Sequence, residues 1–347
     1  MFVVRPVELA DIDALATLAA GTMPGVHTLP KTREKIAASV ERSIASFAAH
    51  VDIPSEESYL FVLEQQGTGA SDGEIVGTAA IFASAGSNGT YFSFRNDVIQ
   101  QVSRDLNISH SVHALTLCSE LTAYSQLSGF YLQHRASAGL EAGLLSRARL
   151  LFAVLAPHRF GDRFFVPLAG ITDKNGQSPF WEALGRKFFK MDFLDAEKVI
   201  GGARNRTLIV ELMPHYPVYV PLLPGDAQAA MGQIHPDGEL AFNLLTEEGF
   251  EADDYIDIFD GGPILQAHKN GLRSFSGSML RHVTHAEPGN SSDLMVSYAI
   301  AASSEQHFRA ITALCPSADA DDCISLTQEA QDALKVAPGD NVICVRI

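Results

Sequence analysis

Cysteine is scarce in this sequence. Its four cysteines are scattered along the chain, and none forms a CxxC pair. A disulfide framework and a structural zinc site both need closely grouped cysteines, so this spacing argues against either. We therefore predict no metal centre and a protein of a reducing compartment. The cysteines are Cys118, Cys315, Cys323 and Cys344.

Long apolar runs are absent as well. No stretch approaches the roughly 18 uncharged apolar residues that a membrane-spanning helix needs. The opening stretch MFVVRPVELADIDALATLAA carries Arg5, Glu8, Asp11 and Asp13 ahead of its apolar part, unlike a secretory signal peptide. The expectation is a soluble, cytoplasmic protein with no membrane partner.

Basic residues are outnumbered. The chain has 25 Lys and Arg against 41 Asp and Glu, a formal charge of −16 at pH 7. Nucleic-acid binding needs clustered Lys and Arg, so we predict no nucleic-acid partner. An acidic protein attracts small cationic substrates, although many cytosolic proteins are simply acidic. With 46% hydrophobic residues and no repeats, the 347 residues fit two domains or one elaborated domain.

The first third of the chain predicts strands and helices in alternation. FVVRPV predicts a strand, and the apolar residues of ELADIDALATLAA recur at helical spacing, as do Ile36, Val40, Ile44 and Phe47 in the segment 31–50. SYLFVLE and EIVGTAAIF flank a Gly/Ser/Asp turn and predict a hairpin. SAGSNGTYFSFRN has the composition of a loop.

The stretch YLQHRASAGLEAGLLSRARLLFAVLA (131–156) predicts a strand, a loop with two glycines and a long apolar helix. This order is typical of a pyrophosphate site at a helix N-terminus. Beyond it, RFFVPLAGI and RTLIVELM predict strands. SPFWEALGRKFF predicts a helix capped by Ser178, with Pro179 in its first position. GELAFNLLTEEGF predicts another helix, closed by Gly249, with an extended run behind it.

Helical periodicity fades from about residue 273. Short strand patterns such as LMVSYAIAA and FRAITAL alternate with polar turns, and the chain ends in a Pro-Gly-Asp turn and a β-branched strand. We predict a body of residues 1–272 and a small β-rich, barrel-like domain of residues 273–347.

The body resembles GNAT-type acyltransferases in the order of its parts. VVRPVELADIDALATLA is similar to their opening strand and helix, EIVGTAAIF to the second strand of their hairpin, and SPFWEALGRKFF to their late helix with a Gly–aromatic end. The resemblance implies an α/β fold with a mixed twisted sheet flanked by helices. FNLLTEEGF echoes PFWEALGRKFF and suggests a second GNAT-like half.

More specific blocks resemble the arginine N-succinyltransferase family. They are SPFWEALGRKFF, ELMPHYPVYVPLLP, MGQIHP and GFEADDYIDIFDGGP. That family implies transfer of succinyl from the cosubstrate succinyl-CoA to the α-amine of L-arginine in arginine catabolism, without a permanently bound cofactor. SYLFVLE, ASAG with YFSFRN, and RTLIVELMPHYPVYVPLLP look most like the alpha subunit of a two-subunit arginine/ornithine form. A homologous beta subunit, or a second copy of the chain, is the implied partner.

The glycine loop departs from the GNAT pattern. That pattern is Q/R-x-x-G-x-G/A, and no register of HRASAGLEAG matches it. Glu141 also brings a negative charge close to the phosphates that the loop would hold. Two alternatives follow. Other groups hold CoA, with Arg147 and Arg149 as candidates, or a partner subunit with an intact loop carries most of the CoA binding.

Acyl transfer needs an oxyanion donor and a proton for the departing thiolate. By the GNAT resemblance, backbone groups of Phe130 and Leu132 lie near the acyl carbonyl. His235 in GQIHP is the candidate proton donor, because the matching histidine has that role in the resembled family and imidazole titrates near neutral pH. His215 in MPHYP competes for the role, but each histidine is also explained as an ordinary loop residue.

The guanidinium of arginine calls for a carboxylate. The candidates are Glu120, before the fourth predicted strand, and Asp257 and Asp260 in DDYIDIFDGGP, where Asp253 and Asp254 lie nearby. An acid beside Gly-Gly is equally explained as a brace of the turn. Arg95 is a candidate for the succinyl carboxylate.

Three functions remain open from the sequence. The first is a succinyltransferase subunit, active alone or with a partner. The second is a non-catalytic alpha subunit that stabilises or regulates the catalytic chain, which the altered loop favours. The third is a GNAT acyltransferase for another amine.

Overall fold

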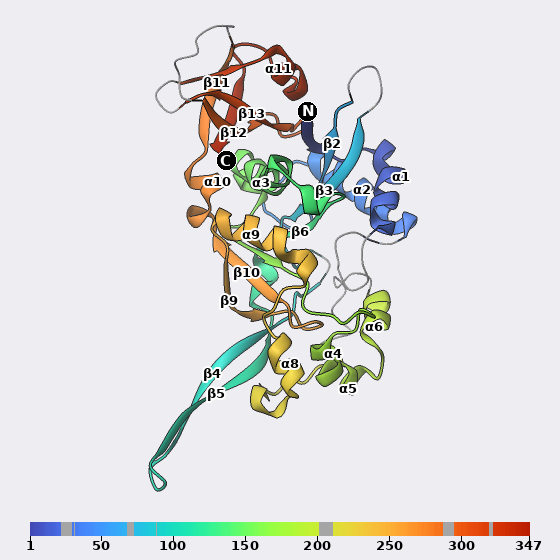
Figure 1. Cartoon of the computed structure of the whole chain (residues 1–347), viewed down its shortest axis with the longest axis vertical. Helices are drawn as coiled ribbons and strands as arrows, with labels where there is room; N and C mark the ends of the chain where they lie inside the picture. Colours follow the sequence, from blue (N-terminus) through green and yellow to red (C-terminus); the bar gives the residue numbers. More distant parts are fainter. Residues whose placement is uncertain are drawn as a thin grey trace.

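A single mixed sheet runs through the molecule (Figure 1). The structure is a computed structural model that describes residues 1–21, 30, 32–67, 73–87, 89–200, 211–286, 295–318 and 322–347. Two strand pairs are parallel and the other pairs are antiparallel. Across the 15-stranded sheet the order is β14 (Cys323–Leu326), β11 (Met279–His285), β15 (Asn341–Arg346), β12 (Met295–Ala302), β13 (Ala310–Pro316), β1 (Phe2–Pro6), β2 (Ser58–Gln65), β3 (Glu74–Phe82), β6 (Ser125–Leu132), β7 (Arg163–Pro167), β10 (Pro263–His268), β9 (Glu251–Ile256), β4 (Ser93–Ser103), β5 (Ile108–Cys118) and β8 (Val218–Tyr219).

Helices flank this sheet, which confirms the predicted mixed α/β class. The α-helices are α1 (Ile12–Ala20), α2 (Arg33–Ala48), α3 (Leu140–Leu155), α4 (Pro179–Ala183), α5 (Gly185–Phe189), α6 (Phe193–Ile200), α8 (Gly225–Ala230), α9 (Glu239–Glu248), α10 (Arg273–Ser276) and α11 (Gln328–Leu334). Single 3-10 turns are η1 (Leu9–Asp11), η2 (Glu120–Ala123), η3 (Arg135–Ser137), η4 (Pro157–Arg159), η5 (Val220–Leu222), η6 (Pro236–Gly238) and η7 (Lys269–Gly271).

Local sequence signals locate many of these elements. The predicted hairpin is the antiparallel pair β2 and β3, and the first predicted strand and helix are β1 and α1. The side chain of Ser178 accepts a hydrogen bond from the backbone N–H of Trp181 and caps α4. Gly249 ends α9 with a φ of 113°, a left-handed conformation that glycine adopts without a Cβ clash.

Two local predictions differ from the structure in part. SAGSNGTYFSFRN was predicted as loop, but its last residues begin β4 at Ser93. RTLIVELM was predicted as a strand; residues 206–210 lie outside the described residues, and Glu211 and Leu212 are helical. β-branched residues favour strands only weakly, because packing partners decide the outcome.

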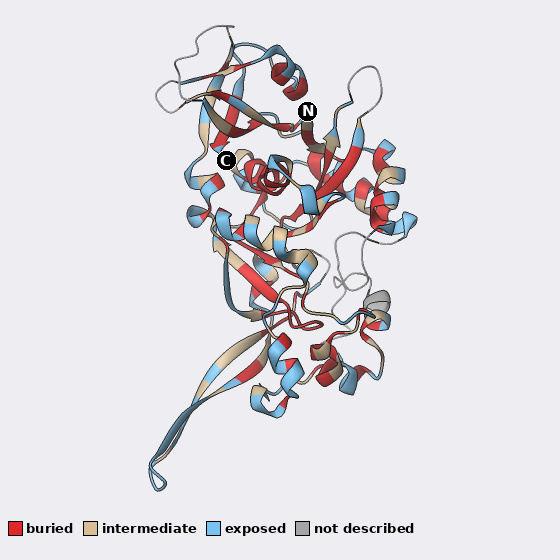
Figure 2. Ribbon diagram, in the orientation of Figure 1, coloured by how far each residue is buried: buried red, intermediate tan, exposed pale blue. Residues whose placement is uncertain are grey.

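Helix α3 lies at the centre of the molecule. It packs against β1, β2, β3 and β6 on one side and against β12 and β13 on another, because the sheet curves around it. Figure 2 shows it coloured as buried almost all round. Most of its side chains are apolar, as is typical of such a position, and Ser146, Arg147 and Arg149 are buried with them. Its neighbours form the largest apolar cluster, with Phe47, Tyr59, Phe61, Phe152 and Phe308 in ring contact.

The strands after residue 273 continue the main sheet. Strand β13 pairs with β1 through Val3 and Ile311, and the outer strands follow from there. The order from β14 to β13 is that of a sheet segment joined to the body, with α11 packed on β13.

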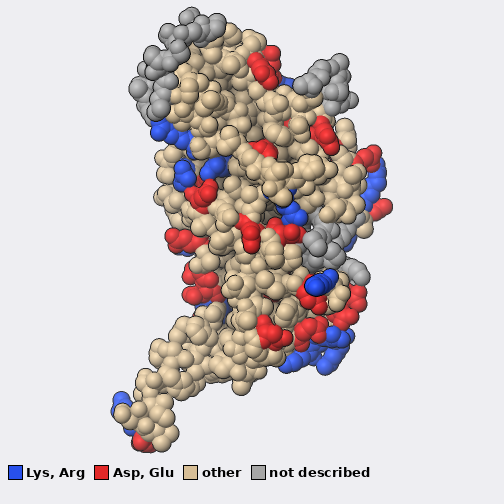
Figure 3. Space-filling model, viewed as in Figure 1, with Lys and Arg blue, Asp and Glu red and all other residues tan. Residues whose placement is uncertain are grey.

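Strands β4 and β5 form a long hairpin that projects from the body (Figure 1). Among the described strands, its partners are β9 at Phe94 and Arg95 and β8 at Ala114 and Leu115, all at its base. Beyond the base its strands carry no Lys, Arg, Asp or Glu, and Figure 3 shows charged side chains on it at the tip.

Candidate active site

Strands β6 and β7 run parallel but pair only at their first residues, Ser125 with Phe164 and Gln126 with Phe165. Each then runs on beside a different neighbour, β6 along β3 and β7 along β10. We call the residues beyond this pairing, 127–132 and 166–170, the β6–β7 fork. It places the edges of two central strands next to each other without a shared ladder.

A bulge in β6 lies inside this fork. Gly129 and Phe130 together oppose Ala79 of β3, which shifts the register between the two strands. Gly129 has a φ of 62°, and its carbonyl accepts a hydrogen bond from Thr78 Oγ1 at 2.8 Å. A bulge interrupts the ladder and turns backbone groups away from their usual partners. Phe130 and Leu132, predicted to lie near the acyl carbonyl, are therefore in and just after the bulge.

His235 lies beside the end of β7. Its backbone N–H donates to the carbonyl of Ala169 at 2.8 Å, and Ile234 bridges to Gly170. Its Nδ1 accepts a hydrogen bond from the backbone N–H of Asp237 at 3.1 Å. Since one ring nitrogen of a neutral imidazole is an acceptor and the other carries the proton, this bond leaves the proton on Nε2. In its neutral form the half-buried ring therefore presents Nε2–H as a hydrogen-bond donor.

Asp257 and Asp260 brace the turn behind His235. Asp260 is buried and accepts from Gly170 N and from Gly262 N, both at 2.8 Å, while Asp257 accepts from Phe259 N at 2.8 Å. A Cβ on Gly262 would lie 2.2 Å from the carbonyl oxygen of Leu168, so the turn packs directly on the end of β7. These contacts agree with the turn-bracing alternative and make Asp260 a positioning residue for the His235 segment.

The glycine loop and the His235 segment are joined by an arginine. Arg135 donates to the carbonyl of Asp237 at 3.0 Å, and its Nη2 lies 3.3 Å from the Asp237 carboxylate. Its guanidinium also lies 5.6 Å from the ring centre of Tyr131 at the end of β6. Arg135 and Asp237 were missed at the sequence level; their proximity to Gly139 and His235 along the chain was the available signal.

The N-terminus of α3 already holds an anion of its own. The backbone N–H of Gly139 donates to Glu141 Oε1 at 2.8 Å. This carboxylate therefore occupies the donor and the positive helix end that a phosphate would use. The loop that departs from the GNAT pattern in sequence thus also differs in structure, because Glu141 binds where a phosphate would bind.

Arg147 and Arg149, predicted as phosphate ligands, are both buried in the described structure. The Nε of Arg147 lies 3.1 Å from Glu248 Oε2, a carboxylate that is itself 2% exposed. A pyrophosphate is too large and too strongly hydrated to reach these two guanidinium groups in the core. Their positions therefore do not support the phosphate role.

Glu120 and Arg95 belong to one exposed network at the base of the hairpin. Arg95 donates to Glu120 Oε1 at 2.5 Å and to Asp97 Oδ1 at 2.7 Å, and Tyr255 donates to the other oxygen of Glu120. The two acids raise the pKa of Arg95, mainly through the hydrogen bond that Arg95 donates to Asp97. A substrate guanidinium at Glu120 would have to displace Arg95, and a succinyl carboxylate at Arg95 would have to displace two acids.

His215 is exposed in the segment before β8, the strand that pairs with β5 of the hairpin.

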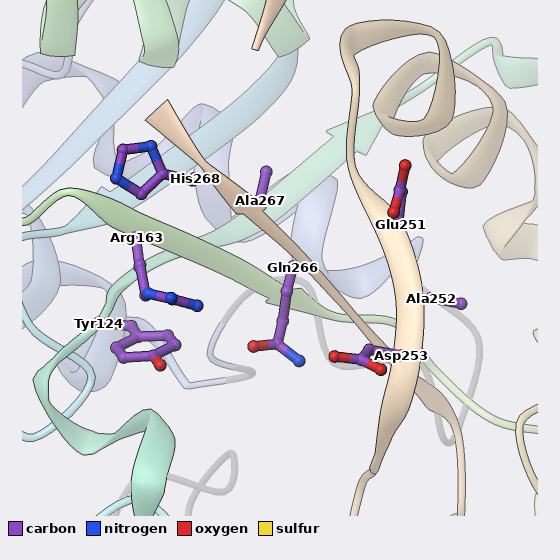
Figure 4. A pocket seen from close by; sticks show the side chains of 8 residues that line it. All are labelled: Tyr124, Arg163, Glu251, Ala252, Asp253, Gln266, Ala267 and His268. Carbon is purple, nitrogen blue, oxygen red and sulfur yellow. The ribbon is translucent and has the colours of Figure 1, made fainter. Parts of the chain in front are cut away.

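Asp253 lines a polar cleft of about 240 Å³ on β7, β10 and β9 (Figure 4). The guanidinium of Arg163 lies over the Tyr124 ring there, at 5.7 Å from its centre. Arg163 begins β7 whereas Ala169, which holds His235, follows its end, a separation of roughly 20 Å along an extended chain. The cleft is therefore distinct from the fork.

Among the residues that the structure describes, no group of three or more His, Cys, Asp or Glu is arranged to hold a metal ion. None of the described helices is long and apolar enough to cross a membrane.

Comparisons with known proteins define the class. The family model described as arginine N-succinyltransferase beta subunit matches residues 2–274. The model for the C-terminal domain of the same subunit matches residues 283–346. The chain belongs to the arginine N-succinyltransferase family, which confirms the resemblance predicted from its sequence and the transferase class.

Particular members are similar over their whole length. The chain is 43% identical to arginine N-succinyltransferase subunit alpha of Pseudomonas aeruginosa, with 100% of both chains covered. It is 34% identical to arginine N-succinyltransferase of Escherichia coli, covering 100% of this chain and 98% of that one. The solved structure of arginine/ornithine succinyltransferase subunit AI from P. aeruginosa has a TM-score of 0.88 and 42% identity, and covers 100% of this chain and 98% of that one.

Proposed function

We propose that this chain is an arginine N-succinyltransferase subunit, which transfers succinyl from succinyl-CoA to the α-amine of L-arginine and, as a second substrate, of ornithine. The family membership supports the reaction class. The observation that carries the proposal is His235, held beside the β6–β7 fork with its proton on Nε2. The fold is proposed to be GNAT-like, the body to span residues 1–272 and the compartment to be the cytoplasm.

The fork suits the chemistry of a thioester. The neutral α-amine attacks the thioester carbonyl, whose oxygen becomes an oxyanion. Backbone N–H groups at the β6 bulge, near Phe130 and Leu132, are proposed to donate to that oxygen. When the carbon–sulfur bond breaks, Nε2–H of His235 protonates the departing CoA thiolate. The α-ammonium loses one proton to water before the attack, and the nitrogen of the tetrahedral intermediate loses a second proton, which passes through water to His235 and replaces the one given to the thiolate. The products are the amide, the CoA thiol and one released proton, and His235 ends in its starting state.

Loss of His235 tests this role. His235→Ala is expected to lower kcat about 10²- to 10⁴-fold, because a general acid contributes that much to transfer of a proton. The assay is CoA release from succinyl-CoA with arginine, run on this chain alone and with a homologous partner subunit. His215→Ala is the matched control, since it removes an exposed histidine distant from the fork. Full activity of the His235→Ala complex would contradict the proposal.

A second function is favoured by one observation, the bond from Gly139 N–H to Glu141. Because the chain's own carboxylate binds at the N-terminus of α3, this bond supports the hypothesis that the chain stabilises a catalytic partner that carries the CoA site. The name of the P. aeruginosa relative, subunit alpha, supports a multi-subunit assembly. The same assay separates the two: activity that needs the partner but is insensitive to His235→Ala belongs to the partner chain.

A further inference from the structure

Three arginines are buried among the described residues, and one differs from the others. Arg159, 5% exposed, donates to Glu305 Oε2, to the Tyr59 hydroxyl and to two backbone carbonyls. Arg147, 7% exposed, pairs with Glu248. Arg149 is 1% exposed, and no carboxylate of the described residues lies within ion-pair distance of it.

The guanidinium of Arg149 lies at the β6–β7 fork. Nε donates to the carbonyl of Ser146 at 3.1 Å and Nη2 to its hydroxyl at 3.0 Å, both within α3. Nη1 reaches the carbonyl of Ser128 at a long 3.4 Å. The guanidinium carbon is 5.6 Å from the ring centre of Phe130. Ser128 and Phe130 flank the Gly129 bulge, so the charge lies directly behind the strand segment proposed to hold the acyl carbonyl.

This charge lacks the anion that its burial requires. A guanidinium has five N–H donors, and three acceptors are in place. Burial lowers the pKa of Arg149 to about 9, which still leaves it protonated at neutral pH. Glu248 favours the charged form through space, but its oxygens bind Arg147 Nε and the Ser274 N–H. A buried cation without an ion pair at contact distance is destabilising, so an anion that arrives from outside is the expected partner.

We propose that Arg149 binds the terminal carboxylate of the succinyl group and thereby selects a dicarboxylic acyl donor. The inference rests on the proposed function. Two methylene groups separate the thioester carbonyl from that carboxylate, a span of roughly 4 Å between carbonyl carbons. With the carbonyl at the bulge, the carboxylate reaches the guanidinium behind Phe130. An acyl group that ends in a methyl has no partner for this charge.

The test compares two acyl donors of equal chain length. Succinyl-CoA and butyryl-CoA differ in the terminal group alone, and both are assayed with the assembly that shows activity. Arg149→Met is expected to lower kcat/KM for succinyl-CoA about 100-fold or more, because a site built for a charged group discriminates strongly. The value for butyryl-CoA is expected to change less than tenfold. Arg149→Lys keeps the positive charge but loses the planar set of guanidinium N–H donors. It should retain part of the preference for succinyl-CoA over butyryl-CoA.

Arg163→Met is the matched control, because it removes an arginine at the other end of β7 and should leave the ratio of the two donors as in the parent protein. Equal losses for both donors in a folded Arg149→Met protein would overturn the inference in favour of a structural role. If that variant does not fold, the Arg149→Lys ratio decides. A parent protein that transfers no succinyl group refutes the proposed function instead. In that case the thermal shift given by succinyl-CoA over butyryl-CoA still tests Arg149, and a shift that survives Arg149→Met overturns the inference.

Discussion

The first and third turns of α3 treat negative charge in opposite ways. At the first turn, the exposed helix end has its own anion, since Glu141 accepts the N–H of Gly139. At the third turn, the buried guanidinium of Arg149 has no carboxylate from the described residues. The exposed N-terminus of α3 is therefore already occupied by a carboxylate, whereas the buried guanidinium of Arg149 has no ion-pair partner among the described residues.

Succinyl-CoA has two anionic parts, the phosphates of CoA and the terminal carboxylate of the acyl group. The two turns of α3 differ in which of these parts they can accept. Phosphates are bulky and bind at surface loops, where this chain offers a competing carboxylate. The terminal carboxylate of the acyl group is small enough to enter the fork. We infer that this chain is better suited to recognise the acyl end than the nucleotide end, which is the arrangement expected if a partner subunit contributes to CoA binding.

The largest expected effect concerns the two neighbouring arginines of α3. Arg147→Met strands Glu248 as a buried lone charge and should reduce the free energy of unfolding by about 3–5 kcal/mol. Arg149→Met removes a lone charge instead and should leave the ligand-free chain within about 1 kcal/mol of the parent, or more stable. Urea unfolding measures both. The comparison breaks if the two variants are equally destabilised; the double variant Arg147→Met with Glu248→Met should recover most of the loss.

A smaller effect is expected at the first turn. Glu141→Gln removes a negative charge from the helix end that a phosphate would use and should tighten CoA binding up to about tenfold, more at low salt. Calorimetric titration with CoA measures the dissociation constant. Glu34→Gln is the matched control, because it removes an acid from the first turn of α2, away from the fork. An unchanged constant in Glu141→Gln would show that the phosphates do not approach α3.

The smallest effect is expected at the exposed ion pair of Arg95 and Asp97, whose side chains are 35% and 32% exposed. The hydrogen bond from Arg95 lowers the pKa of Asp97 below its ordinary 3.8. A lowered carboxyl pKa stabilises the fold above pH 3.8, and this contribution is lost as the pH falls through the lowered value. Solvent screening limits it to about 1 kcal/mol or less. Asp97→Asn should therefore cost that much at pH 7, whereas Asp105→Asn at the hairpin tip should cost nothing measurable by urea unfolding.

Local chemistry explains which parts of the fold were predictable. Ser178 with Pro179, and Gly249 after an apolar helix, are signals that act within one turn, and the structure has both caps. The hairpin of β2 and β3 has its turn residues between its strands. The outcome at residues 211 and 212 was missed because strand propensity depends on what packs against the segment, which a local pattern does not contain.

The residues of the candidate site also fall into those that local sequence predicted and those that it did not. His235 was found through its motif, and its tautomer follows from the nearby Asp237. Glu141 was recognised as an obstacle to phosphate from its place in the loop. The partners of Glu120, Arg147 and Asp260 were not predictable, because they come from distant parts of the chain.

The sequence by itself determined the family, the mixed α/β class, the caps and the candidate histidine, because these depend on motifs and on contacts between near neighbours. Only the tertiary structure decided which buried charges are neutralised. Arg147 pairs with Glu248 across 101 residues and Arg159 with Glu305 across 146. Arg149, which lies between these two arginines in the sequence, has no such acid among the described residues. Ion pairing in a core depends on how the sheet wraps around α3, and no local pattern in the chain carries that information.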